Sequence, residues 1–271
     1  MFLSKKVCTA LALASIVLSP IAKAGILYSN GFETDPNRVA SGTDGITAAS
    51  GSYFAKAVEG SYTTWGGYNF GAGGGVPTAF QEYSTSIDIY LNVAGGWANG
   101  SGFDFSSSIN NNSGNFLRDF IFNGGFYNSS DITGPGAGTD RFVISASNNS
   151  QPTSAYPKNP GRGPIAIDTT GWYTFENNFM DVGGFLSVDM NIFDSSHNLV
   201  NSWTLGGTDA ISGVGGNRYG WFDYLNNIPY LAVDNLALTV PDTAAPEPAD
   251  IAIFVLGLME LAVIDRKRRN I

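Results

Sequence analysis

The chain has 271 residues and a net charge of −9, and its composition is 43% apolar and 13% aromatic with 34 glycines. It is long enough to bury a core and too aromatic for a disordered polymer, and its glycine content favours short strands joined by turns. The single cysteine, Cys8, and the single histidine, His197, argue against structural zinc sites, disulfide frameworks, cysteine nucleophiles and histidine-based triads.

Residues 1–24 have the order of a secretory signal peptide. A basic start, an apolar run and small residues follow one another as Lys5, Lys6, residues 7–18, Ala22 and Ala24. A retained membrane anchor is the alternative, but the run is too short to cross about 30 Å of hydrocarbon. We therefore expect a signal helix that is cleaved after Ala24, and Cys8 would leave with it.

Period-2 alternation dominates residues 25–245 and predicts strands. In residues 185–193, for example, one face carries Leu186, Val188, Met190 and Ile192. Runs of this kind occur, in chain order, at 26–33, 83–93, 115–122, 141–147, 172–179, 185–193, 199–205 and 230–239. The fifth to seventh runs predict a three-stranded meander, with His197 at the exposed tip of its second hairpin. No helical periodicity of useful length interrupts them.

Other features of these residues have structural interpretations. The prolines at 152, 157, 160 and 164 predict one long exposed loop, and the glycines at 71–75 predict another. Arg118 and Asp119, inside an apolar strand, are expected to form an ion pair at a sheet edge. Strands without a helical layer to cover them favour a two-sheet sandwich.

The first and last strands of this region carry short motifs. Residues 26–33 end in Phe32-Glu33, and residues 231–238 contain Asp234-Asn235 between apolar residues. This pattern resembles the concanavalin A-like lectin and glucanase jelly rolls, in which the opening and closing strands lie side by side. The resemblance implies an all-β fold, a two-sheet antiparallel jelly-roll sandwich, over residues 25–245.

Glucanases of that fold carry paired carboxylates on one strand, because hydrolysis needs an acid and a nucleophile about 5 Å apart. The glutamates of the region are Glu33, Glu59, Glu82 and Glu176, and none begins such a pattern. We therefore expect a protein that is not an enzyme. A divergent hydrolase is the alternative, and two acids meeting in an aromatic-lined groove would favour it.

Two clusters combine aromatic and polar side chains as sugar-binding sites do. They are Asn217, Arg218, Tyr219 and Trp221, and, nearer the N-terminus, Trp65 and Tyr68. They are our candidate glycan-binding residues. The alternative is that Tyr219, Trp221 and Phe222 alternate into the core, and we expect at least one of Tyr219 and Trp221 to do so.

Residues 25–245 hold seven Lys and Arg against 19 Asp and Glu. This acidity argues against nucleic acid as a partner. The abundant Asp and Asn suit a structural calcium ion, although no D-x-D-x-D-G loop is present. We expect no other cofactor.

The last residues, 246–271, have a separate organisation. Pro246, Glu247 and Pro248 precede an apolar run at 251–264, and the basic cluster Arg266, Lys267, Arg268 and Arg269 follows. This resembles the PEP-CTERM sorting signal of Gram-negative bacteria, although Glu260 and Asp265 depart from the pattern. A core helix ending in a charged run is the alternative.

The PEP-CTERM resemblance implies a short hydrophobic helix, transient inner-membrane anchoring and processing by an exosortase after signal peptidase has acted. It also implies delivery to the cell surface or to an extracellular polysaccharide matrix. A 14-residue helix spans only about 21 Å, and the basic cluster would stop its transfer. The function expected is a secreted, envelope-associated sandwich that binds glycans, or a purely structural matrix protein.

Overall fold

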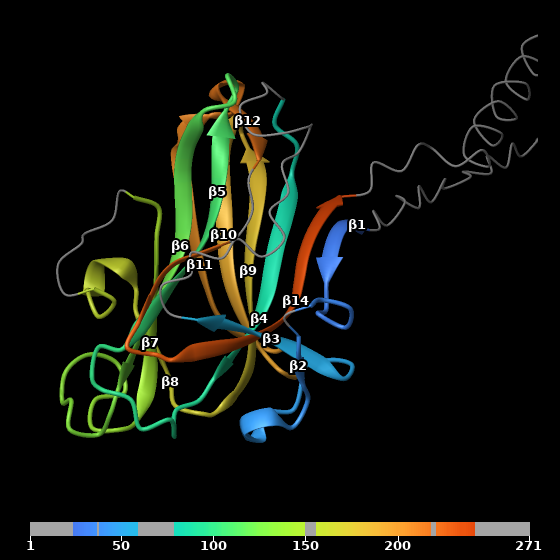
Figure 1. Ribbon diagram of the computed structural model, residues 1–271. Coiled ribbons are helices and arrows are strands. Elements are labelled where there is room, and N and C mark those ends of the chain that lie inside the picture. The colour runs from blue at the N-terminus through green and yellow to red at the C-terminus, as the bar shows by residue number, and fades with distance from the viewer. Residues whose placement is uncertain (1–23, 37, 59–78, 150–155, 218–220, 242–271) are drawn as a thin grey trace, which may run out of the picture. The chain divides into compact units, whose positions relative to one another are not determined.

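The computed structural model describes residues 24–36, 38–58, 79–149, 156–217 and 221–241. Its strands, shown in Figure 1, are β1 (Ala24–Asn30), β2 (Val39–Ala40), β3 (Tyr53–Val58), β4 (Tyr83–Leu91), β5 (Gly102–Asn111), β6 (Phe116–Tyr127), β7 (Arg141–Ser147), β8 (Ile165–Ile167), β9 (Gly171–Val182), β10 (Phe185–Asp194), β11 (Leu199–Ala210), β12 (Val214–Asn217), β13 (Trp221–Asn226) and β14 (Tyr230–Pro241). Three single-turn 3₁₀ helices, η1 (Thr43–Gly45), η2 (Pro160–Arg162) and η3 (Ile211–Gly213), complete the described elements.

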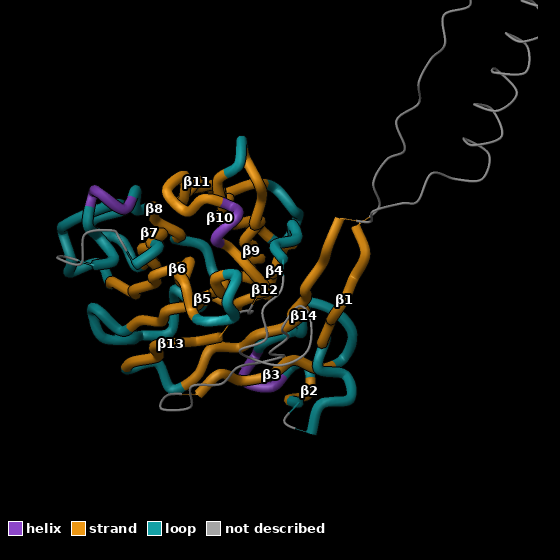
Figure 2. Tube along the Cα trace, turned by 90° about the horizontal axis from the view of Figure 1, so that it is seen from above, coloured by secondary structure: helices purple, strands orange, loops and turns teal. Residues whose placement is uncertain are grey.

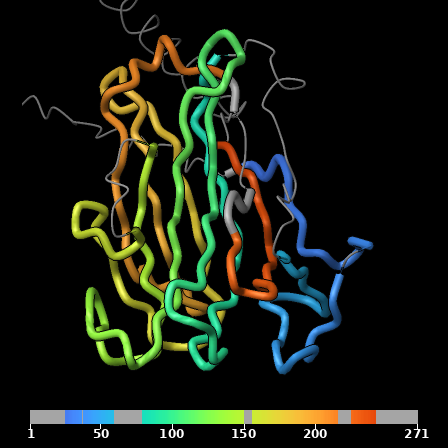
Figure 3. Tube along the Cα trace, turned by 60° about the vertical axis from the view of Figure 1, so that its left-hand side comes forward, coloured from blue at the N-terminus to red at the C-terminus, as the bar shows by residue number. Residues whose placement is uncertain are grey.

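The first sheet has eight strands in the order β11-β10-β9-β4-β14-β3-β2, with β1 also paired to β14. The antiparallel β1–β14 register runs from Ala24 opposite Pro241 to Asn30 opposite Leu236. The predicted pairing of the opening and closing strands is therefore confirmed. In Figure 3 the N-terminal segment, in blue, lies beside the closing strand, in red.

The predicted meander is confirmed as β9, β10 and β11. Phe185 to Asp194 pair with Val182 to Tyr173, and Val188 pairs with Leu205. The β10 side chains Leu186, Val188, Met190 and Ile192 are buried on one face, as their alternation predicts. The β10–β11 turn closes when Asp194 N donates to Asn198 O, 2.9 Å away, and His197 sits exposed within it at a φ of +59°.

The second sheet has the order β12-β5-β6-β7-β8, with β13 also paired to β5. Strands β12 and β13 pair with successive segments of the same edge of β5. Figure 2 shows the two sheets as separate layers, β11-β10-β9-β4 and β8-β7-β6-β5. The all-β, two-sheet antiparallel sandwich is thus as predicted.

Phenylalanines from both sheets meet in the core. Phe175 of β9 has its ring centroid 5.1 Å from that of Phe122 of β6 and 6.1 Å from that of Phe103 of β5. Both contacts are edge-on, an arrangement that aromatic pairs prefer. The core between the sheets is therefore aromatic.

A second, smaller cluster lies on the outer face of the eight-stranded sheet. Its buried members are Ile46, Ala48, Phe54 and Ala232, and Trp172 and Tyr90 pack against them. The loop of residues 41–52, which joins β2 to β3, supplies the first two. The 41–52 loop is thereby anchored over β14 and β4.

Two expectations about polar and loop residues are wrong. Arg118 does not pair with Asp119, because neighbours on a strand point to opposite faces. Its guanidinium instead binds Asp209 of β11 through two hydrogen bonds of 2.8 and 3.0 Å. The proline-marked loop is not fully exposed, since Pro157 and Arg162 are buried where it folds back onto the protein.

Helices are expected at 1–24 and 246–271, but residues 1–23 and 246–271 lie outside the described residues, and Ala24 begins β1. Within the described part of the chain, no helix has the length and apolar character needed to cross a membrane.

Candidate functional site

A row of polar side chains crosses the outer face of the eight-stranded sheet. Asp88 of β4 is opposite Thr174 of β9 on one side and opposite Asp234 of β14 on the other. Asp88 and Thr174 alternate with core residues of their strands and so point away from the core. Beside this row lies a hollow of about 430 Å³, lined by residues 47–50, by Asp88, Trp172, Thr174 and Asn235, and by Asp194, Ser195 and His197 of the β10–β11 turn.

Two neighbours hold the Asp88 carboxylate in place. Thr174 Oγ1 donates to Asp88 Oδ1 over 2.5 Å, and Asn235 Nδ2 donates to Asp88 Oδ2 over 2.8 Å. A carboxylate offers about four acceptor positions, so each oxygen retains capacity for a further donor. Asp88 is half-buried and lines the hollow, which makes it an oriented acceptor for a ligand.

A break in the β4–β14 register places Asn235 over this row. The register shifts between Asp234 and Ala237, and Asn235 has a φ of +48°. Such irregularities re-aim a side chain. The re-aimed amide accepts a hydrogen bond from Ser50 Oγ, 2.6 Å from its Oδ1, and thus joins the 41–52 loop to the sheet.

Asp234 lies beneath this junction and is 0% exposed. Its carboxylate accepts hydrogen bonds from Ser50 N at 3.1 Å and Asn235 N at 2.8 Å. Burial raises the pKa of Asp234 to about 6, and the charge of Asp88 adds to the rise while the backbone hydrogen bonds oppose it. No Lys or Arg appears among the groups that shift it.

Trp172 separates two hollows. It lines the 430 Å³ hollow and a neighbouring one of about 350 Å³, which it shares with Asp168, Asp194 and Ser195. The indole Nε1–H donates to Thr47 O at 2.7 Å, and the ring centroid lies 5.3 Å from that of Tyr90, edge-on. These contacts hold a half-buried aromatic ring at fixed orientation between two adjoining depressions.

The β10–β11 turn supplies the opposite side of the hollow. Asp194 Oδ1 accepts from Ser196 N and Asn198 N at 2.8 and 2.9 Å. Hydrogen bonds from the side chain and backbone of Asn198, with smaller contributions that include His197, lower the pKa of Asp194. Asp194 therefore stays ionised at the edge of the hollow.

Asp88 and Asp194 are two acids in an aromatic-lined groove, the feature that would favour a hydrolase. General acid catalysis needs a carboxyl whose pKa is raised and which reaches the substrate. Burial raises the pKa of Asp234, which is 0% exposed, and hydrogen bonds lower the pKa of Asp194.

The described glutamates have partners elsewhere. Glu33 accepts from the backbone of Ser52 and Tyr53, Glu82 from Asp181 N, and Glu176 from the amides of Asn178 and Asn191. Glu59 lies outside the described residues. Within the described ranges, no group of three or more His, Cys, Asp or Glu side chains is placed to hold a metal ion.

The residues predicted to bind glycans are only partly placed. Asn217 ends β12 opposite Ile109, and Trp221 begins β13 opposite Ser106, so both border β5 of the six-stranded sheet. Arg218, Tyr219, Trp65 and Tyr68 lie outside the described residues, as do Ala22 and the sorting residues Pro246, Glu247, Pro248, Arg266, Lys267, Arg268 and Arg269. Ala24, the predicted cleavage position, opens β1.

The groove formed by the two hollows beside Trp172 was not predicted from the sequence, although one signal for it was present. In β9 the core face carries Tyr173, Phe175 and Phe179, and Trp172 falls on the opposite, polar face with Thr174. A large aromatic on the polar face of an alternating strand indicates either an outer cluster or a binding surface. Here Trp172 packs against the outer cluster and also lines both hollows.

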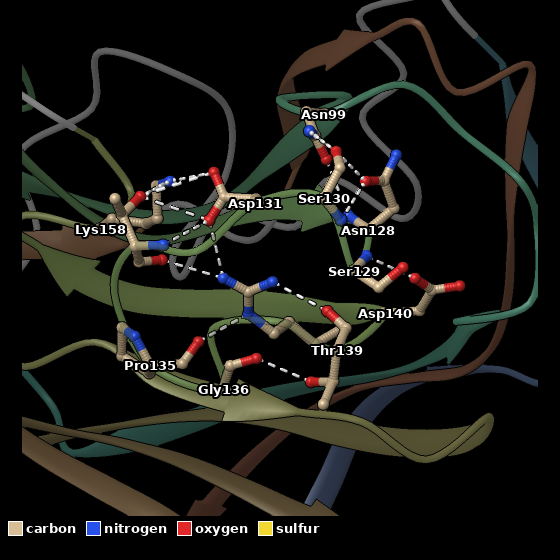
Figure 4. A network of polar contacts seen from close by, with 12 residues as sticks. Asn99, Asn128, Ser129, Ser130, Asp131, Pro135, Gly136, Thr139, Asp140 and Lys158 are labelled. Atoms are coloured by element: carbon tan, nitrogen blue, oxygen red, sulfur yellow. Dashed lines mark hydrogen bonds and ion pairs between the residues drawn. The ribbon is translucent and has the colours of Figure 1, made fainter.

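A second polar cluster, in Figure 4, has a structural role. It holds the loop of residues 128–140, which joins β6 to β7. Arg141, 0% exposed, donates to the carbonyls of Pro135, Thr139 and Thr133 and to Asp131 Oδ1 at 2.6 to 2.9 Å. Lys158 Nζ binds Asp131 Oδ2 at 2.7 Å. The Asp131 carboxylate is thus paired with both cations of the cluster.

Comparison with known proteins finds structural likeness but no family match. No protein-family model and no curated protein matches the chain. Among solved structures, the CBM2 module of the evolved Dit of Lactobacillus casei BL23 phage J-1 is similar over 83% of this chain and 99% of that chain, with 11% identity and a TM-score of 0.41. A likeness of this degree carries no argument about ligand or site.

Proposed function

We propose that this protein is a secreted, non-catalytic glycan-binding β-sandwich, and that its ligand lies along the two hollows beside Trp172. The observation that carries the proposal is the position of Trp172 between them, with Asp88, Thr174 and Asn235 alongside. Sugar rings need a flat aromatic surface for their C–H face and planar polar groups for their hydroxyls. The groove offers both within about 430 Å³.

The shape supports a chain rather than a single sugar. Two depressions that share Trp172, Asp194 and Ser195 adjoin one another across the sheet. Binding sites for small molecules generally occupy about 300–1,000 Å³. The two hollows together fall in that range, so an oligosaccharide segment is the ligand that fits them.

The glycan proposal is tested with an array of oligosaccharides and three proteins: the wild type, Trp172→Ala and Trp203→Ala. Trp203 is a matched control because its indole Nε1–H also donates to a loop carbonyl, Gly163 O at 2.8 Å, and it lines neither hollow. We expect Trp172→Ala to weaken binding about tenfold or more and Trp203→Ala to preserve it. Equal effects of the two substitutions would contradict this site.

The absence of any bound glycan in the wild type would favour a purely structural matrix protein. Hydrolysis of a bound oligosaccharide, removed by Asp88→Asn, would favour the hydrolase instead. Each result is distinct from the one that the proposal predicts.

We also propose that the protein is exported by its signal peptide and sorted through residues 246–271. The support is the Pro246-Glu247-Pro248 motif ahead of an apolar run and a basic end. An intact-mass measurement on protein released by the native host should show that residues after this motif are missing. Retention of Ile271 on the released protein would contradict sorting by cleavage.

A further inference from the structure

The groove beside Trp172 is acidic. Asp88 and Asp194 line its larger hollow, Asp168 and Asp194 line the smaller one, and Asp234 lies beneath. Among the described residues that line the two hollows, His197 is the one basic residue. Because these described residues include no Lys or Arg, they form no ion pair of that kind with the carboxylates of the groove.

The cations of the described part of the chain are engaged elsewhere. Lys56 binds Asp44 at 2.6 Å, Arg118 binds Asp209, and Arg141 and Lys158 share Asp131. Arg162 donates to Asn123 and lies over the Tyr156 ring, and Arg38 lies over the Tyr53 ring. None of these side chains lines either hollow.

The raised pKa of buried Asp234 agrees with the acidic lining of the groove. Asp234 sits opposite Asp88 in the β4–β14 pairing, and its pKa is raised by burial with a contribution from the Asp88 charge. A bound cation near Asp88 would reduce that repulsion. A positively charged ligand group is therefore the complement that the groove lacks.

We propose that the groove selects glycans that carry free amino groups, such as oligomers of glucosamine, over neutral glycans and over polyuronates. This inference rests on the proposed glycan-binding function. The Asp88 carboxylate, held by Thr174 and Asn235, would accept a charge-assisted hydrogen bond from the sugar ammonium group, and such bonds are about twice as strong as neutral ones. A uronate in the same place would meet like charges.

The test compares three oligosaccharides of equal length by calorimetry at a pH at which the amine is protonated: glucosamine, N-acetylglucosamine and uronate oligomers. We expect the amine form to bind about tenfold more tightly than the acetylated form, and the uronate form most weakly. Asp88→Asn should remove this preference, so that the amine and acetylated oligomers then bind with equal affinity.

Asp189→Asn is the matched control for charge. Asp189 also accepts a threonine hydroxyl from the neighbouring strand, Thr204 Oγ1 at 2.6 Å, on the same sheet face, but it lines neither hollow. Removing this carboxylate should leave the amine preference intact. If Asp189→Asn reduces the preference as much as Asp88→Asn does, the attraction belongs to the acidic surface in general and the inference is overturned.

Two further outcomes separate the inference from the function on which it rests. If amine and acetylated oligomers bind equally and Trp172→Ala weakens both, glycan binding stands and selection for amines is wrong. If none of the three oligomers binds and the array also shows no ligand, the proposed function itself is overturned.

Discussion

Two loops of this sandwich are tied down by carboxylates, but in opposite electrostatic surroundings. In the 128–140 loop, Asp131 faces Lys158 and Arg141, and the Lys158 hydrogen bond above all holds the pKa of Asp131 well below its usual range. The 41–52 loop is held by Asp234, which forms no salt bridge within the described residues and whose pKa burial raises to about 6. The difference separates a loop anchored by ion pairs from a loop anchored by a buried carboxylate through backbone hydrogen bonds.

The two carboxylates therefore respond oppositely to acid. Asp131, with its lowered pKa, stabilises the fold above its unfolded pKa of about 4, and that contribution is lost as the pH falls below it. Asp234, with its raised pKa, stabilises the fold most when protonated. Its contribution is lost as the pH rises through about 6.

The largest expected loss of stability comes from breaking the contacts that Arg141 makes with the 128–140 loop. Arg141→Met should lower the free energy of unfolding by about 3–5 kcal/mol, because it leaves Asp131 partly unpaired and several loop carbonyls without a donor. Urea unfolding monitored by tryptophan fluorescence measures it. A loss below about 1 kcal/mol would show that the 128–140 loop does not depend on this guanidinium.

The next largest effect on stability is expected at Asp234, which holds the 41–52 loop. Asp234→Asn should raise the free energy of unfolding at pH 7 by at most about 3 kcal/mol, since the amide carries no charge, and by less because its NH2 group replaces one of the two oxygens that accept from Ser50 N and Asn235 N. The gain should disappear at about pH 3, below both the folded pKa of Asp234 and its unfolded value. Urea titrations at both pH values check this.

If Asp234→Asn lowers the free energy of unfolding at pH 7, the result contradicts a destabilising charge on buried Asp234. A variant that is less stable than the wild type only when Ca²⁺ is present, with EDTA abolishing the difference, would place the expected calcium ion at this carboxylate.

A smaller loss of stability is expected when Lys158, the second cation beside Asp131, is replaced. Lys158→Met should cost about 1 kcal/mol, because Asp131 keeps its bond to Arg141 and the lysine is partly exposed. Its loss should also make the acid-induced decline in stability smaller, because the Lys158 hydrogen bond is the largest cause of the lowered Asp131 pKa and its removal brings the folded pKa closer to the unfolded one. An unchanged acid limb in thermal melts would argue against that cause.

The sequence shows some strands clearly and others hardly at all. Strands β9 and β10 were predictable because their alternation matches one buried and one polar face. Strand β5 was missed because it is buried on both faces, so serines such as Ser106 and Ser108 carry no contrast between inside and outside.

The groove was harder to predict than the strands. It depends on the docking of Ser50 against Asn235, residues 185 positions apart in the chain, and on a local break in the β4–β14 register. Neither leaves a periodic signal. Only the position of Trp172 on a polar face was visible beforehand.

The central claim is that Trp172 contacts a bound glycan, and the indole N–H signals of a ¹⁵N-labelled protein test it most directly. On titration with an oligosaccharide that binds on the array, the Trp172 Nε1–H resonance, assigned with Trp172→Phe, should shift in proportion to saturation. The Trp203 Nε1–H, bonded to Gly163 O away from both hollows, should stay in place. A saturating glycan that moves Trp203 or another indole and leaves Trp172 unchanged would contradict the site.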